Sequence, residues 1–185
     1  MNSSTLSGTL NLFRYYKQLT EKAITQLSDD QLHKDPGADL NSIAVLMKHL
    51  SGNMKSRWTH FRTEDGEKPW RNRDTEFVDD FRSMTELMNF WEEGWKVLFE
   101  ALHSVKEEEL DNIIYIRNEG ATVRVGIDRQ LAHIAYHVGQ IVLIARLFTG
   151  EKWESLSIPK GKTEEYNREK FGSEKKFGFY KDRLK

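Results

Sequence analysis

The chain has 185 residues, a formal net charge of −1 from 28 basic and 29 acidic side chains, and no cysteine. A chain of this length fits a single domain, residues 1–185, and can bury enough surface to fold without a disulfide or a structural metal. The absence of cysteine excludes thiolate metal sites and a cysteine nucleophile, and the evenly mixed charges argue against a nucleic-acid partner. The polar first residues lack the layout of a signal peptide, so we expect a cytoplasmic protein.

Four stretches of the chain place apolar residues three and four positions apart, which is the spacing of an amphipathic helix. The prolines fall between these stretches, where the helical pattern lapses. In chain order, the predicted helices cover residues 6–27, 41–63, 84–102 and 126–149. Polar linkers join the first three helices, and the first linker contains a short helical turn at 29–33.

Between the third and fourth predicted helices, residues 110–125 read as two short extended runs around Asn118-Glu119-Gly120, which is a hairpin signal. Gly150 ends the fourth helix. Residues 151–185 are charged, with scattered aromatic side chains, and we expect an extended tail packed partly on the helices. The sequence thus predicts an all-α protein, a four-helix bundle with a hairpin-like insertion and a C-terminal tail.

The fourth predicted helix is apolar enough to need comparison with a membrane span. Residues 131–148 match the length of a spanning helix. They include His133, His137, Gln140 and Arg146, and ionisable groups at that depth are costly in lipid. We therefore expect a helix buried centrally in the bundle and no membrane partner.

His133 and His137 are the sharpest local feature of the sequence. Residues four apart on a helix lie one above the other on one face, so two imidazoles there can bind one metal ion. Their apolar neighbours predict that both rings are at least half buried, and a buried imidazole needs a partner for each nitrogen. A pair of core histidines bonded to backbone or carboxylates would satisfy the same pattern. No glutamate follows His133, so the HExxH metalloprotease arrangement is absent.

A third ligand has to come from another part of the chain, and His49 is the best candidate. It lies beside the apolar stripe of the second predicted helix and is aimed at the interior of the bundle. His60 follows at the end of that helix and is expected to be exposed, while His33 and His103 fall in a loop and at a helix end. Three neutral imidazoles leave a coordination position open, which is typical of catalytic rather than structural sites.

Several polar residues fall near these histidines. Asn53, one turn further along the second helix, either orients a ligand or is an ordinary surface residue. Gln140 can reach the site from the fourth helix. Arg57, Arg71 and Arg73 can bind an anionic substrate, but we favour ordinary salt bridges with neighbouring carboxylates. The carboxylates available for this pairing are Glu64, Asp65, Asp74 and Glu76.

Four segments carry a resemblance to a known family. They are NSIAVLMKHLSGNMKSRW (41–58), DGEKPWRNRDTEF (65–77), HIAYHVGQIVLIARL (133–147) and WESLSIPKGKTEEYN (153–167). With these segments the chain resembles the DinB-like (YfiT-like) superfamily of four-helix-bundle metalloproteins and, within it, the DUF1572 family. The superfamily motif, one histidine on the second helix and an HxxxH pair on the fourth, matches His49, His133 and His137.

The resemblance implies an up-down-down-up bundle with a three-histidine site for a divalent metal, often in a homodimer. We expect zinc or nickel, with iron or manganese as alternatives. Some relatives in the superfamily are thiol S-transferases that use bacterial low-molecular-weight thiols such as bacillithiol, so transfer or hydrolysis of a small-molecule substrate is the expected function. The alternatives are a non-catalytic metal-binding or stress-response interaction module, and a plain helical bundle without metal.

Overall fold

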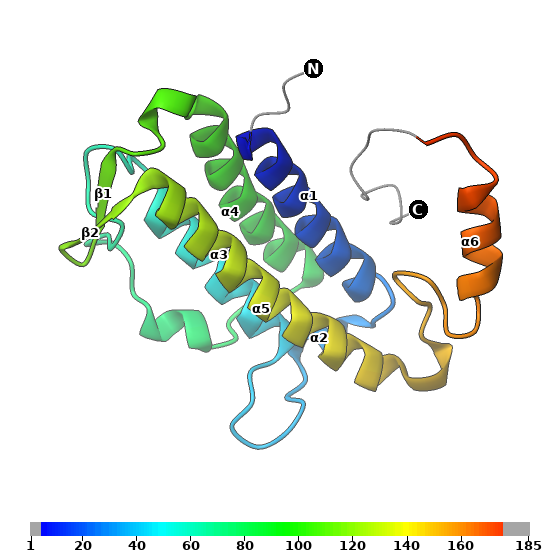
Figure 1. Cartoon of the computed structure of the whole chain (residues 1–185). Helices are drawn as coiled ribbons and strands as arrows, with labels where there is room; N and C mark the ends of the chain where they lie inside the picture. Colours follow the sequence, from blue (N-terminus) through cyan, green and yellow to red (C-terminus); the bar gives the residue numbers. More distant parts are fainter. Residues whose placement is uncertain (1–4, 176–185) are drawn as a thin grey trace.

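The computed structural model describes residues 5–175, and most of them lie in helices (Figure 1). The helices are α1 (Thr5–Ile24), α2 (Asp29–His33), α3 (Ile43–Trp58), α4 (Met84–Ser104), α5 (Val123–Thr149) and α6 (Thr163–Phe171). Short 3-10 turns lie at η1 (Asp74–Phe77), η2 (Glu107–Glu109) and η3 (Gly150–Lys152). The strands are β1 (Ile113–Ile116) and β2 (Glu119–Thr122).

The four long helices form the bundle. α3 packs against α4 and α5, and α1 packs against α5 and α4. α1 and α5 run in one direction while α3 and α4 run in the other (Figure 1). Asp29, just after α1, accepts a hydrogen bond of 3.0 Å from the backbone N–H of Met84 at the start of α4. The end of α1 and the start of α4 therefore lie at the same end of the bundle, as expected for two helices that run in opposite directions. The predicted all-α four-helix bundle is confirmed.

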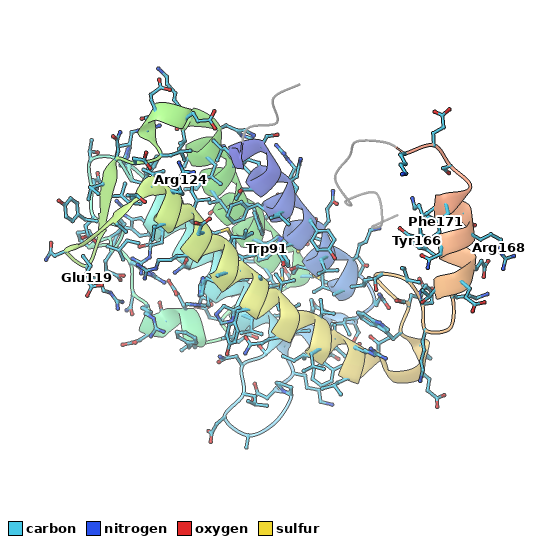
Figure 2. All side chains as sticks on the ribbon, in the orientation of Figure 1. Trp91, Glu119, Arg124, Tyr166, Arg168 and Phe171 are labelled. Carbon is cyan, nitrogen blue, oxygen red and sulfur yellow. The ribbon has the colours of Figure 1, made fainter. Side chains whose placement is uncertain are left out.

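The core between the helices is built from large aromatic and aliphatic side chains. Phe13, Trp91 and Trp95 are fully buried, and Trp91 lies inside the bundle in Figure 2. Burial of such side chains is the main favourable contribution to holding the helices together. Gly94 lets α4 approach α3 closely, because a Cβ at this position would lie 2.7 Å from the Cα of Ser51.

α3 lies at the centre of the bundle, and α5 does not. Nearly every side chain of α3 is buried. α5 buries one face through Ile134 and Val138 but leaves Leu143 and Leu147 more than half exposed. The helical segment Val123–Lys152 is long and apolar enough to cross a membrane, a criterion that core helices of soluble proteins also meet. Only 28% of its most apolar 18-residue stretch is buried. The prediction of central burial for this helix is wrong, because apolar composition does not separate a core face from an exposed one.

The second helix was predicted to end at residue 63, but α3 ends at Trp58. Thr59 is extended, and His60 adopts a left-handed conformation with φ of 48°. A left-handed residue just past the last helical turn is a common way to end a helix. α5 begins at Val123, where the Thr122 hydroxyl accepts a hydrogen bond from a backbone N–H in the first turn and caps the helix.

The predicted hairpin is present between α4 and α5. β1 and β2 pair antiparallel, with Ile116 opposite Glu119. The two turn residues, Arg117 and Asn118, have φ of 56° and 61°, as in a type I′ turn. The Asp65 carboxylate accepts hydrogen bonds from both of their backbone N–H groups, at 2.8 and 2.9 Å. The loop before η1 is thereby tied to the hairpin.

The segment predicted as an extended tail contains a helix. Trp153 and Leu156 pack against the core, as expected for the start of the tail. Further along, α6 contributes no buried side chain, and Phe171 is 84% exposed on it (Figure 2). Acidic residues in the first turn of α6 and basic residues in its last turn stabilise this surface helix through its dipole. Residues 176–185 lie outside the described part of the chain.

Candidate metal centre

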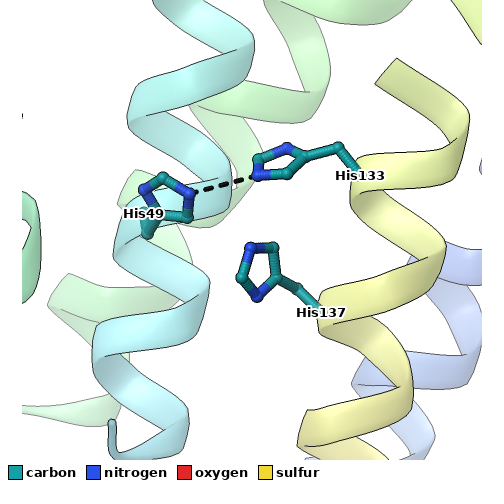
Figure 3. Close-up of side chains that lie close together, drawn as sticks. All are labelled: His49, His133 and His137. Carbon is teal, nitrogen blue, oxygen red and sulfur yellow. Dashed lines mark hydrogen bonds between the residues drawn. The ribbon is translucent and has the colours of Figure 1, made fainter. Parts of the chain in front are cut away.

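Three histidine side chains from two helices meet in the interior of the bundle. His49 comes from α3, while His133 and His137 come from α5 (Figure 3). The ring of His49 lies 5.1 Å from each of the other two rings, which are themselves 4.7 Å apart between centroids. One nitrogen from each ring falls within 4.8 Å of the other two. The structure therefore brings together the three histidines predicted from the sequence, as a group that could hold a metal ion.

The spacing of the ring nitrogens fits one shared ion. The Nε2 atoms of His49 and His133 are 3.2 Å apart. Two imidazole nitrogens that bind a zinc ion tetrahedrally at the usual bond length lie about 3.3 Å from each other. The rings of these two residues therefore already have the nitrogen separation that a single divalent ion needs.

The outer nitrogens of two rings have partners that turn the inner nitrogens toward one another. Nδ1 of His49 lies 2.9 Å from Oε2 of Glu76, and a carboxylate only accepts, so this nitrogen carries the proton. In the neutral form of His49, Nε2 then has its lone pair facing the site. Nδ1 of His137 lies 2.7 Å from Oε1 of Gln140, which fixes its ring in the same way. Metal-binding histidines in proteins are usually oriented by such partners.

Glu76 was not predicted at the site, and it is the residue that connects His49 to the loop after α3. Its carboxylate is buried and accepts two hydrogen bonds from Arg71, at 2.7 Å from Nε and 2.9 Å from Nη2. Burial opposes ionisation, but the hydrogen bonds from His49 and Arg71 and their charges outweigh it and lower the pKa of Glu76. The neighbouring ring of Phe77 stacks on His49 at 4.9 Å between centroids.

Gly52 makes room for the Glu76 carboxylate. A Cβ at Gly52 would lie 2.5 Å from Oε1 of Glu76, far inside van der Waals contact. Gly52 is three residues from His49, so it lies on the same face of α3. A glycine inside an apolar helix, one turn from a candidate ligand, is the sequence signal that could have indicated a group packed against the helix there.

The electrostatics of the cluster favour neutral imidazoles at His133 and His137. Burial, followed by the charges of the other two histidines and of nearby arginines, lowers the pKa of His133 from 6.5 to about 3. Burial also lowers the pKa of His137, although its hydrogen bond to Gln140 acts in the opposite direction. A neutral imidazole is the form that binds a metal ion.

A cavity of about 280 Å³ lies against His49 and His133. Asn53 and Arg57, both singled out in the sequence, line this cavity. The remaining lining residues are Trp58, Arg71, Arg73, Ile114, Ile116, Arg117, Gly126, Arg129 and Gln130. The candidate metal centre is therefore open on the side of the cavity, and a small molecule there would lie beside two of the three ligands.

Arg57 and Arg71 form salt bridges, as expected, but mostly with different partners, whereas Arg73 forms no salt bridge in the described part of the chain. Arg57 and Arg71 both approach Glu67, at 3.2 and 3.4 Å, and Arg71 also pairs with Glu76. Of the carboxylates proposed from the sequence, Glu64 pairs with Lys68 instead. Which carboxylate each arginine meets depends on how the loop folds back, and that is not encoded in local sequence.

The other three histidines lie away from the cluster. His33 contacts Asp79 at 2.8 Å, His103 contacts Arg14 at 3.1 Å, and His60 is exposed beyond the end of α3. None of them belongs to the group formed by His49, His133 and His137.

Among solved structures, the chain is similar to a conserved protein from Enterococcus faecalis, with 18% sequence identity and a TM-score of 0.57. The alignment covers 78% of this chain and 96% of that one, and at this identity it supports the fold alone. No curated protein matches the chain. The family described as "Protein of unknown function (DUF1572)" matches residues 2–162, which include all three histidines. The chain therefore belongs to the DUF1572 family, as its sequence segments predict.

Proposed function

We propose that the protein is a metal-dependent transferase that joins a small thiol to an electrophilic substrate. The observation that supports the proposal is a group of three histidines, two of which, His49 and His133, line an open cavity. A divalent ion held there would lower the pKa of a thiol or water ligand and orient it. Zinc or nickel suits the all-nitrogen ligand set best, and iron or manganese are the alternatives.

The composition of the cavity wall favours thiol transfer over hydrolysis. Many metal-dependent hydrolases add a protein general base, often a carboxylate, that helps to deprotonate the bound water. Among the described residues that line the cavity there is no aspartate or glutamate. Glu76, the carboxylate behind His49, is occupied by His49 and Arg71 and does not line the cavity. A thiol has an ordinary pKa of about 8.5, against about 15.7 for water, so it loses its proton more readily and depends less on a protein base.

The side chains of the chain itself have distinct tasks in this proposal. Glu76 and Gln140 hold the rings of His49 and His137 with their Nε2 atoms toward the site. In the reaction, the sulfur of the thiol forms a bond to an electrophilic carbon. The bond from that carbon to its leaving atom breaks, and the electron pair goes to the leaving atom. In an alkyl halide this releases a halide ion and the thiol proton passes to solvent, whereas in an epoxide the ring oxygen stays on the product and takes up a proton.

The test is a turnover assay with bacillithiol and a panel of alkyl halide and epoxide electrophiles. We expect turnover with metal-loaded protein, and loss of it on chelation and in the His133→Ala variant. His60→Ala is the matched control, since His60 is exposed and outside the cluster. Metal binding without any turnover would instead favour a non-catalytic metal-binding module, and thiol-independent ester cleavage would favour a hydrolase. Either result would contradict the proposal.

A further inference from the structure

The cavity beside the histidines is strongly basic. Arginines from α3, the loop after it, the hairpin turn and α5 contribute to its wall, and among the described lining residues there is no acidic side chain. These arginines are Arg57, Arg71, Arg73, Arg117 and Arg129. A water-filled hollow with charges of one sign concentrates ions of the opposite sign.

Carboxylates outside the wall neutralise only some of these charges. Glu67 lies within 3.2–3.4 Å of Arg57, Arg71 and Arg117, so one carboxylate serves three guanidinium groups. In the described part of the chain, Arg129 makes no ion pair, and Arg73 has only the ring of Phe77, at 4.9 Å, as a partner. The cavity therefore has more positive charge than its surroundings balance.

Gln130 adds a buried donor that has no acceptor. The side chain is 4% exposed, and its Oε1 accepts a hydrogen bond of 3.0 Å from Nε1 of Trp58. Because an indole nitrogen only donates, this contact fixes the orientation of the amide. Nε2 of Gln130 then has no hydrogen-bond partner among the described residues. A buried unpaired donor costs free energy that an acceptor in the cavity would recover.

We propose that this cavity is a binding site for the anionic group of a small substrate, a carboxylate or a phosphate, recognised by Arg73, Arg129 and Gln130. The volume of about 280 Å³ suits a small molecule, not a peptide or a nucleic acid. The inference rests on the proposed function in one respect only, that the reacting end of the same molecule lies at the three histidines. Recognition of the anion rests on the cavity wall.

Calorimetric titration of the full chain, stripped of metal, tests the anion site separately from catalysis. Inorganic phosphate and succinate serve as the two probes and distinguish a phosphate from a carboxylate preference. We expect at least one to bind, and Arg129→Gln to weaken binding roughly tenfold, the loss typical of one charge-assisted hydrogen bond. Arg146→Gln is the matched control, because Arg146 lies on the same helix, is exposed and does not line the cavity.

Gln130→Glu tests the buried donor. The substitution keeps an oxygen to accept the bond from Trp58 and replaces the unpaired N–H group with an oxygen that repels an anion. We expect it to weaken binding at least as much as Arg129→Gln, with the fold checked by thermal melting. If the variant does not fold, Arg129→Gln alone decides.

Two results would overturn the proposal. One is the absence of binding by both probes, and the other is binding that Arg129→Gln and Arg146→Gln weaken equally, which would indicate a general charge effect. Failure of thiol transfer with normal anion binding would remove the proposed function and leave the anion site in place.

Discussion

The three histidines differ in how firmly the surrounding side chains orient them. His49 is buried, bonded to Glu76 and stacked against Phe77, so its ring has little freedom. His137 is held by a single amide, from Gln140 on its own helix. We infer that the ring of His49 keeps its position when a metal ion binds, and that the side chains of the α5 histidines move to complete the coordination.

Glu76→Gln tests the contribution of the carboxylate behind His49. The amide is close in size but accepts more weakly and no longer balances Arg71. We expect metal affinity to fall roughly ten- to a hundredfold, as is typical when a partner of a ligating histidine is lost. Competition with a chromogenic chelator measures the affinity. Glu64→Gln is the control, since Glu64 pairs with Lys68 away from the histidines. Equal affinities in the two variants would argue against the role given to Glu76.

Gly52→Ala tests whether the glycine keeps space for that carboxylate. Alanine is the better helix former, so a helix without this contact would gain up to about 1 kcal/mol. Here we expect a net loss of about 1–3 kcal/mol from overpacking, because the new Cβ would meet the Glu76 carboxylate. Gly8→Ala on α1 is the matched control, with nothing within 4 Å of the added Cβ, and should be neutral or stabilising. Urea denaturation measures both, and a stabilising Gly52→Ala would exclude the close contact.

At the scale of the elements, the spacing of apolar residues predicted each long helix and the turn-forming residues predicted the hairpin. Helix ends were less predictable. α3 stops at Trp58 although the apolar pattern continues to Phe61, because His60 takes a left-handed conformation. Phe61 is nevertheless buried, so tertiary packing keeps its side chain in the core after the helix has ended. The spacing of apolar residues predicts which side chains are buried, but it does not predict whether the backbone between them is helical.

His60→Gly tests this explanation for the end of α3. Left-handed backbone costs a residue with a Cβ about 1 kcal/mol, and glycine avoids most of that cost. We expect His60→Gly to be more stable than His60→Ala by about 1 kcal/mol in urea denaturation. Equal stabilities, or a more stable alanine variant, would contradict a strained helix end at this position.

For the molecule as a whole, the three candidate metal ligands could be predicted from the sequence, but the side chains that surround them could not. His49, His133 and His137 each lie on a periodic helix, so their faces follow from sequence. Glu76 lies in a short 3-10 turn 27 residues after His49, and only the folded loop brings the two together. The unpaired donor of Gln130 likewise depends on Trp58, a residue on another helix.

The exposed face of α5 is the other feature that needs the whole molecule. Tyr136, Leu143 and Leu147 are 65%, 58% and 66% exposed and, with Gly139 between them, form one stripe along the helix. We propose that the homodimer expected from the resemblance forms through this stripe, since two copies related by a two-fold axis would each cover the apolar surface of the other.

Charge introduced into the stripe should separate the copies. We expect wild-type protein to have the mass of a dimer in light scattering after size exclusion, and Leu143→Glu combined with Leu147→Glu to have that of a monomer. Phe171→Glu is the control, because Phe171 is 84% exposed on α6. A monomeric wild type, or a dimer that persists in the double variant, would rule out this interface.

Binding of a divalent metal ion by His49, His133 and His137 is the central property proposed for this protein. Elemental analysis of protein purified without a histidine tag tests it most directly, together with melting in the presence of chelator. We predict about one metal ion per chain, its loss in His133→Ala but not in His60→Ala, and a lower melting temperature after chelation, because bound metal stabilises the folded state. Less than about a tenth of an equivalent in wild-type protein, with melting unchanged by chelator, would show that the three histidines do not hold a metal ion.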